Sequence, residues 1–326
     1  MDSIKPNLLL RLVPLLLGIA LLFVLFAQTD FSIFNELSNA NVLGVLIAIA
    51  LVLVTLLFRG IKWNYILGFY GVKQSNWRAT QVFCMGTMVG FWTPLKLGIF
   101  VRALYVKPLA LTKSTASILI DRLTDILLVV IMAIILFSFF LVAATFEHAA
   151  PPLEGVFLVL IIIAVGILAF LLQSKTVIGF LEKVFSRLIP FSKLRVAVTQ
   201  TFDEIGAYLS SPKRAALVLG LGALGFVSTI GYYFFTAFAL HVSIPFTWLS
   251  AMVALTILIE TIPVTALGFG TREGAWLLAS PILQITPSQA VALPLLATLI
   301  NYATLSVIGL SLSFEKKDTK TAALEK

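Results

Sequence analysis

Long apolar runs separated by short polar segments dominate this chain. The runs extend over residues 12–28, 42–58, 117–144, 156–172, 217–240 and 290–312. A helix needs about 20 mostly apolar residues to cross the hydrocarbon core of a bilayer. We therefore predict an all-α polytopic membrane protein with about six full crossings, formed as a single transmembrane domain over residues 1–326.

Two further apolar stretches, residues 80–107 and 248–284, are interrupted by helix breakers. The breakers are Pro94 and Gly98 in the first stretch and Pro263, Gly268 and Gly270 in the second. Broken backbone at membrane depth is tolerated only where protein or water satisfies its polar groups. We predict two re-entrant helical hairpins that enter from opposite faces. A variant in which each hairpin contains a full pair of crossings fits the pattern equally well.

The composition agrees with a membrane protein. The chain is 60% hydrophobic and 12% charged, against roughly 25% charged residues in soluble domains. One cysteine and two histidines exclude an internal disulfide and leave little for a metal site, so no metal or cofactor is expected.

The net charge of +8 reflects basic residues gathered on one face of the membrane rather than nucleic-acid binding. With both termini in the cytoplasm, Arg272 is the one basic residue that does not fall on or beside the cytoplasmic side. This distribution predicts a multi-pass protein of the inner cell membrane. Residues 175–214 form an amphipathic cytoplasmic segment, which we expect to contact anionic lipid. A homo-oligomer is left open.

The second predicted hairpin carries the charges that are hardest to explain in apolar surroundings. Arg272 and Glu273 follow the breakers directly, and Glu260 interrupts the apolar run before them. An ionisable group at the bilayer centre costs roughly 2.5–3.5 kcal/mol on insertion scales, so such groups usually carry function. Glu260 is expected to pair with Arg272 or Arg102 rather than act as a proton-coupling carboxylate. A purely structural ion pair between Arg272 and Glu273 is the alternative.

Polar residues also gather in and after the first predicted hairpin. Lys96 and Arg102 lie within it, and Asp121, Arg122 and Asp125 follow in the next helix. Asp121 and Asp125 are one turn apart and share a helix face, whereas Arg122 does not. All five are candidate substrate-binding residues. Structural bracing by the helix cluster and an ordinary basic rim for Lys96 and Arg102 stay open.

The two hairpins resemble each other in sequence. The pairs that match are Pro94 with Pro263, Gly98 with Gly268, Arg102 with Arg272 and, displaced by two residues, Ala103 with Ala275. Weak repeats that enter from opposite faces point to an inverted-repeat transporter with its site near the midplane. Helix ends there offer unpaired N–H groups to a phosphate or carboxylate, and Arg102 and Arg272 would add forked donors.

Three motifs in order resemble the flippase-like transmembrane domain of lysylphosphatidylglycerol synthases and its stand-alone relatives. They are Pro94-x-x-x-Gly98-x-x-x-Arg102, Asp121-Arg-Leu-Thr-Asp125 and the segment from Pro263 to Glu273. The resemblance implies a role in lipid translocation. It departs from the family pattern at Ile99, where an acid is usual, so that acid's role is not carried over. Because the chain ends at Lys326, we expect no soluble aminoacyl-transferase domain and no lipid synthesis.

The leading hypothesis is a transporter that moves an anionic phospholipid or lipid-linked sugar-phosphate headgroup between leaflets. Two alternatives remain open. One is a membrane enzyme that uses Asp121 and Asp125 as acid, base or Mg²⁺ ligands, and the other is a small-anion carrier. The chain has no nucleotide-binding loop of the G-x-x-x-x-G-K-[ST] type. A gradient, the membrane potential or downstream consumption would have to drive the movement.

Overall fold

The computed structural model describes residues 8–29, 32–91, 93–106, 109–146, 192–261, 265 and 268–324. Every regular element in these ranges is a helix, which confirms the all-α prediction. The elements are α1 (Leu8–Gln28), α2 (Ile33–Ser38), α3 (Val42–Phe69), α4 (Asn76–Phe91), the 3₁₀ helix η1 (Pro94–Tyr105), α5 (Leu111–Phe146), α8 (Ser192–Leu209), α9 (Pro212–Ala239), α10 (Phe246–Thr261), α11 (Thr271–Leu283) and α12 (Pro287–Leu324).

Three of the described helices are long and apolar enough to cross a membrane. They are α3, α9 and the part of α12 from Pro287 to Leu312. The predicted crossing at residues 156–172 and the first part of the predicted amphipathic segment, residues 175–191, lie outside the described residues. Helix α8 and the start of α9 cover the rest of that segment.

Helix α3 continues past the predicted apolar run as far as Phe69, although its last part contains charged residues. Lys62 and Trp63 are almost fully buried, at 1% and 0% exposed. Lys62 donates a hydrogen bond to the carbonyl oxygen of Asp121 in α5 at 3.1 Å. The helix continues because its polar side chains have partners inside the protein.

Two segments of the chain have the same sequence of elements. Helices α3 and α9 each have 28 residues, and α4 and α10 each have 16. The first two elements of the second segment begin 170 positions after their counterparts, at 212 against 42 and at 246 against 76. The connecting turns match as well, since Val72 N donates to Leu67 O and Val242 N donates to Ala237 O.

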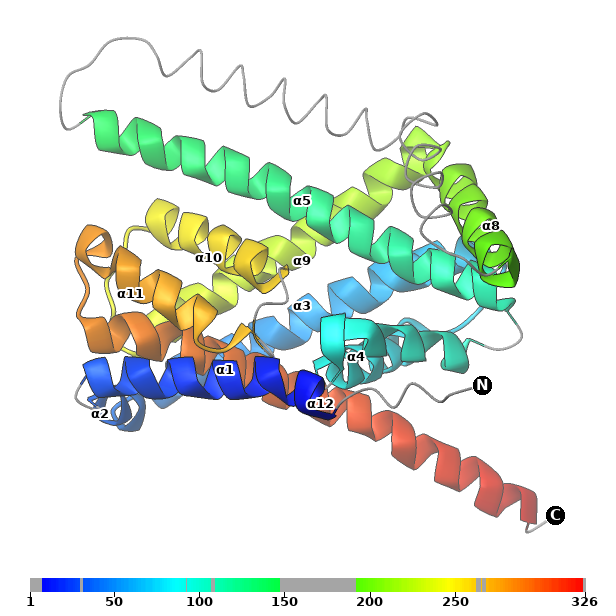
Figure 1. Ribbon diagram of the computed structural model, residues 1–326, viewed down its shortest axis with the longest axis horizontal. Coiled ribbons are helices and arrows are strands. Elements are labelled where there is room, and N and C mark those ends of the chain that lie inside the picture. Colours follow the sequence, from blue (N-terminus) through cyan, green and yellow to red (C-terminus); the bar gives the residue numbers. More distant parts are fainter. Residues whose placement is uncertain are drawn as a thin grey trace.

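The repeats run in opposite directions. Asn41 N, before the start of α3, donates to Ala239 O at the end of α9 at 2.7 Å, and Gly231 of α9 lies against Leu51 of α3. Helix α5 of the first repeat packs against α10 of the second, and α12 packs against α4. Figure 1 shows α5 along one side of the molecule and α12 along the other. Helices α3 and α9 are therefore antiparallel, and the long helix of each segment packs against the shorter helix of the other, as the predicted inverted repeat requires.

The first hairpin consists of α4 and η1, which fold back on each other. Gly98 of η1 lies so close to α4 that a Cβ added there would come within 2.5 Å of the Val89 carbonyl oxygen. Gly90 of α4 lies against Ile99 in the same way, and Ile99 is buried at 9% exposed. The position that departs from the family pattern is therefore an apolar contact inside the hairpin.

The second hairpin consists of α10 and α11. Trp276 Nε1 of α11 donates to Thr256 Oγ1 of α10 at 2.8 Å, so the two arms lie side by side. Between them Gly268 and Gly270 have φ of 73° and 80°, a left-handed conformation that glycine adopts without steric cost. Helical hairpins occur in both predicted regions.

The predicted matches between the hairpins can be compared with the spacing of the repeat. Gly98 and Gly268 are 170 positions apart, and so are Arg102 and Arg272, which is also the spacing between the starts of α3 and α9. At this spacing Ala103 corresponds to Glu273, and its predicted match with Ala275 requires a displacement of two residues. At the same spacing Pro94 corresponds to position 264, one residue after its predicted match, Pro263. Residues 262–264 lie outside the described residues.

Candidate functional site

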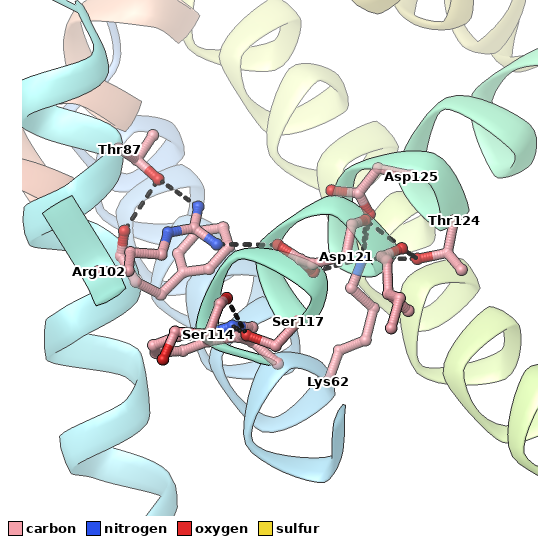
Figure 2. Close-up of polar contacts among 11 residues, drawn as sticks. Lys62, Thr87, Arg102, Ser114, Ser117, Asp121, Thr124 and Asp125 are labelled. Atoms are coloured by element: carbon pink, nitrogen blue, oxygen red, sulfur yellow. Dashed lines mark hydrogen bonds and ion pairs between the residues drawn. The ribbon is translucent and has the colours of Figure 1, made fainter. Parts of the chain in front are cut away.

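A cluster of four charged side chains joins α3, η1 and α5 (Figure 2). Lys62 Nζ lies 2.8 Å from Asp121 Oδ1 and also contacts the Asp125 carboxylate. Arg102 Nη1 donates to Asp121 Oδ2 at 2.9 Å. Two cations therefore face two carboxylates. The expectation that Asp121 and Asp125 share a helix face is confirmed, since Lys62 contacts both.

Arg102 is fully enclosed by the first hairpin and its neighbours. Its guanidinium donates through Nη2 to Thr87 Oγ1 at 3.1 Å, and its Cζ lies 4.0 Å from the centre of the Phe83 ring. The side chain is 0% exposed, and Gly86 leaves the space for it. In this conformation Arg102 braces η1 against α4 and α5, and it has no surface that a ligand can reach.

A second cluster lies in the second hairpin. Arg272 Nη1 donates to Glu260 Oε1 at 2.6 Å, and its Nε and Nη2 donate to Glu273 Oε1 at 3.0 and 2.6 Å. The predicted pairing of Glu260 with Arg272 is confirmed. Arg272 and Glu273 are buried, whereas the Glu260 side chain is 26% exposed. Glu260 is thus the member of this cluster that a ligand can approach.

The start of α11 carries its own anion. Gly270 N donates to Glu273 Oε2 at 2.7 Å, which satisfies an amide that would otherwise be free at the helix N-terminus. The carboxylate also sits where the helix dipole favours negative charge. The prediction that this end offers an unpaired N–H to a substrate is therefore wrong for Gly270.

Lys96 connects the two hairpins. It lies in the turn of the first hairpin with φ of 57°, and its Nζ donates to the backbone carbonyl of Glu260 at 2.6 Å. Tyr302 of α12 lies beside both tips, since its ring centre is 4.3 Å from that of Phe91 and 6.3 Å from that of Phe269. The tips of the two hairpins therefore meet in one polar region.

Two arginines beside these clusters have no carboxylate partner among the described residues. Arg59 of α3 lies one helical turn before Lys62, and Arg122 of α5 follows Asp121 directly. Both side chains are half-buried, and the buried Nε of Arg122 makes no hydrogen bond. The charged groups that act on Lys96 are Glu260, Arg59, Arg122 and Arg272, so both arginines lie near the hairpin tips.

The structure brings the sequence-predicted residues into two connected clusters and adds two that the sequence did not single out. Asp121, Asp125 and Arg102 form the first cluster, and Arg272, Glu260 and Glu273 form the second. Lys62 and Arg59 follow the apolar run of residues 42–58, so the sequence alone groups them with the other basic residues of the cytoplasmic side. The one signal in the sequence that could have found them is a helix extended past the apolar run, because both residues then lie inside α3 rather than after its end.

The described residues form a helical membrane protein with three helices long and apolar enough to cross a bilayer and with two clusters of charged residues in its helical hairpins and their neighbours. The chain belongs to the family described as the lysylphosphatidylglycerol synthase TM region, whose model matches residues 11–309. The resemblance inferred from the motifs is confirmed.

A relative from Methanocaldococcus jannaschii, the UPF0104 membrane protein MJ1595, is 21% identical over 312 residues, which are 90% of this chain and 92% of the relative. The family ties this membrane protein to lipid handling.

Proposed function

We propose that the protein moves an anionic lipid headgroup, of a phospholipid or a lipid-linked sugar phosphate, between the two leaflets. The observation that carries this proposal is the contact between the hairpin tips, where Lys96 of one hairpin bonds to Glu260 of the other. A headgroup that passes between the tips must part this contact and is met there by charged groups of both repeats.

The hairpins have the dimensions that such a route requires. Helix α4 has 16 residues and α11 has 13, which correspond to about 24 and 20 Å of helix, less than the roughly 30 Å hydrocarbon core. We propose that both hairpins are re-entrant and enter from opposite faces, so that their tips meet within the bilayer. The acyl chains would stay in lipid while the headgroup crosses between the tips.

The enzyme alternative is less well supported by the geometry. Asp121 and Asp125 are the carboxylates that it would use, and the ammonium group of Lys62 lies between them. The protein's own cation therefore occupies the position between the two carboxylates where Mg²⁺ would bind. A small-anion carrier would use the same basic surroundings and is separated from a lipid transporter by experiment.

The test uses the full chain in liposomes that contain phosphatidylglycerol with a fluorescent headgroup label. A membrane-impermeant quencher measures the fraction of label that reaches the outer leaflet. We expect the wild type to exceed protein-free liposomes and Lys96→Ala to lower the rate about tenfold, equivalent to about 1.4 kcal/mol. Lys213→Ala removes an exposed lysine at the start of α9 and should leave the rate unchanged.

Three outcomes contradict the proposal. The first is a wild-type rate equal to that of protein-free liposomes, and the second is an unchanged rate in a Lys96→Ala protein that elutes as a folded monodisperse species. The third is a change in the mass of the recovered lipid, which would favour an enzyme. Uptake of soluble phosphate with no dependence on acyl chains would favour the anion carrier.

A further inference from the structure

The balance of charge in the membrane-embedded part of the molecule points to where the anionic group is held. In the first cluster Lys62 and Arg102 are matched by Asp121 and Asp125. In the second, Glu260 and Glu273 are matched by Arg272 together with Lys96, which lies on the Glu260 carbonyl. Each cluster is therefore neutral by itself.

Arg59 and Arg122 are left over. No carboxylate of the described residues pairs with either, and their helices pack against the first hairpin, α3 against α4 and α5 against η1. Arg59 is ten residues before the end of α3, about 15 Å along the helix, so it does not reach the end of the helix. Charges without a partner are costly when they are partly buried at membrane depth, and they are usually balanced by an opposite charge.

We infer that Arg59 and Arg122 together bind the phosphate group of the transported lipid, and that Arg102 and Arg272 position the hairpins. This inference rests on the proposed function and names the residues that hold its substrate. Guanidinium groups present forked donors that match phosphate oxygens, and they hold such groups more specifically than lysine does. The buried, unbonded Nε of Arg122 is a donor that a phosphate oxygen would satisfy.

Lys96 completes the surroundings of this site. It is a cation whose electrostatic neighbours include Arg59 and Arg122, and its ammonium donates to the neutral backbone oxygen of Glu260. A phosphate placed between the two arginines would compete with the Glu260 carbonyl for the Lys96 ammonium. Binding of the headgroup and separation of the hairpin tips are coupled in this arrangement, since the same ammonium serves both contacts.

The experiment measures ligand binding apart from transport. Protein in a phosphate-free maltoside detergent is titrated with dioctanoyl phosphatidylglycerol, and the rise in the midpoint temperature of unfolding reports binding. Dioctanoylglycerol, which lacks the phosphate, serves as the ligand control. Inorganic phosphate is the third titrant and distinguishes a lipid headgroup from a free anion.

We expect the wild type to be stabilised by the phosphatidylglycerol and not by dioctanoylglycerol. Arg59→Ala and Arg122→Ala should each weaken the apparent Kd about tenfold or more, because each loses charge-assisted hydrogen bonds to the phosphate. Arg122→Lys should recover part of the affinity, and Lys213→Ala should bind as the wild type does. An equal response to inorganic phosphate keeps the site but assigns it to the free anion.

A structural role for the arginines gives a different result. Without ligand, Arg59→Ala and Arg122→Ala should melt at or above the wild-type temperature, because each removes an unbalanced charge. A large loss of stability in both ligand-free variants overturns the inference, and so does unchanged binding in both. Binding that depends on the arginines, in a wild type that moves no lipid in liposomes, contradicts the proposed function and leaves the site standing.

Discussion

Substitution of Asp121 by asparagine tests how the first cluster is held together. Asp121 lies between Lys62 and Arg102, at 2.8 and 2.9 Å, and all three side chains are at most 1% exposed. The substitution keeps the shape of the side chain and removes its charge. Lys62 retains Asp125, but Arg102 is left buried without a carboxylate.

The expected cost follows from that geometry. Removal of one partner from a buried ion pair typically destabilises a protein by about 3–5 kcal/mol, because the other charge stays buried and uncompensated. The matched control is Glu204→Gln. Glu204 pairs with Lys113 at 3.9 Å, with side chains 27% and 46% exposed. An exposed pair of this kind contributes about 0–1 kcal/mol.

The assay is denaturant unfolding of the purified protein in detergent micelles, followed by tryptophan fluorescence. Trp63, one of the five tryptophans of the chain, has its ring centre 5.6 Å from the guanidinium of Arg102, so its part of the signal reports on the cluster. The double variant Arg102→Met with Asp121→Asn should cost clearly less than the sum of the two single variants, because it removes both charges of the pair. A cost for Asp121→Asn below about 1 kcal/mol, or additive effects in the double variant, would refute the reasoning.

Two further predictions concern the turns and the orientation in the membrane. His241 has φ of 55° at the position where the first repeat has Gly71 with φ of 80°, so His241→Gly should stabilise the protein by about 0.5 kcal/mol, measured by the same unfolding assay. A destabilised His241→Gly variant would show that the histidine side chain makes a contact that outweighs its backbone strain. For orientation, the predicted topology places Asn39 outside the cell and Lys73 in the cytoplasm. Asn39→Cys should therefore react with a membrane-impermeant maleimide in intact cells, and Lys73→Cys should not. Both positions are exposed, and the native Cys84 is buried. The reverse labelling pattern would overturn the predicted cytoplasmic location of both termini.

The hairpins could be predicted from the sequence because their signals are local. Two apolar runs are interrupted by helix breakers, namely Pro94, Gly98, Gly268 and Gly270, and Arg272 is a charged residue in apolar surroundings. The pairing of Arg272 with Glu260 could be predicted for the same reason, because the two residues lie only twelve positions apart. The crossing count and the depth of the hairpins stay predictions.

The first cluster could not be predicted in full because its partners are far apart in the chain. Lys62 meets Asp121 across 59 positions, and nothing near Lys62 in the sequence indicates an acid. A basic residue after an apolar run reads as the end of a crossing, which is its commonest meaning. Whether Lys62 marks the end of a crossing or pairs with an acid depends on the burial of Asp121 on α5. That burial depends on how the helices pack. Arg59 was missed for the same reason.

The spacing of 170 residues between the starts of α3 and α9 and of α4 and α10 has a consequence for what sets the orientation of the chain in the membrane. Two antiparallel copies give a fold with nearly the same outline when it is turned over, so the helices alone do not distinguish inside from outside. In the first copy the turn after the long helix and the start of the next helix carry Lys73 and Arg78, and the second copy has Ser243 and Trp248 at these positions. By the positive-inside rule, a few such cations on one copy are enough to give the two copies opposite directions in the membrane.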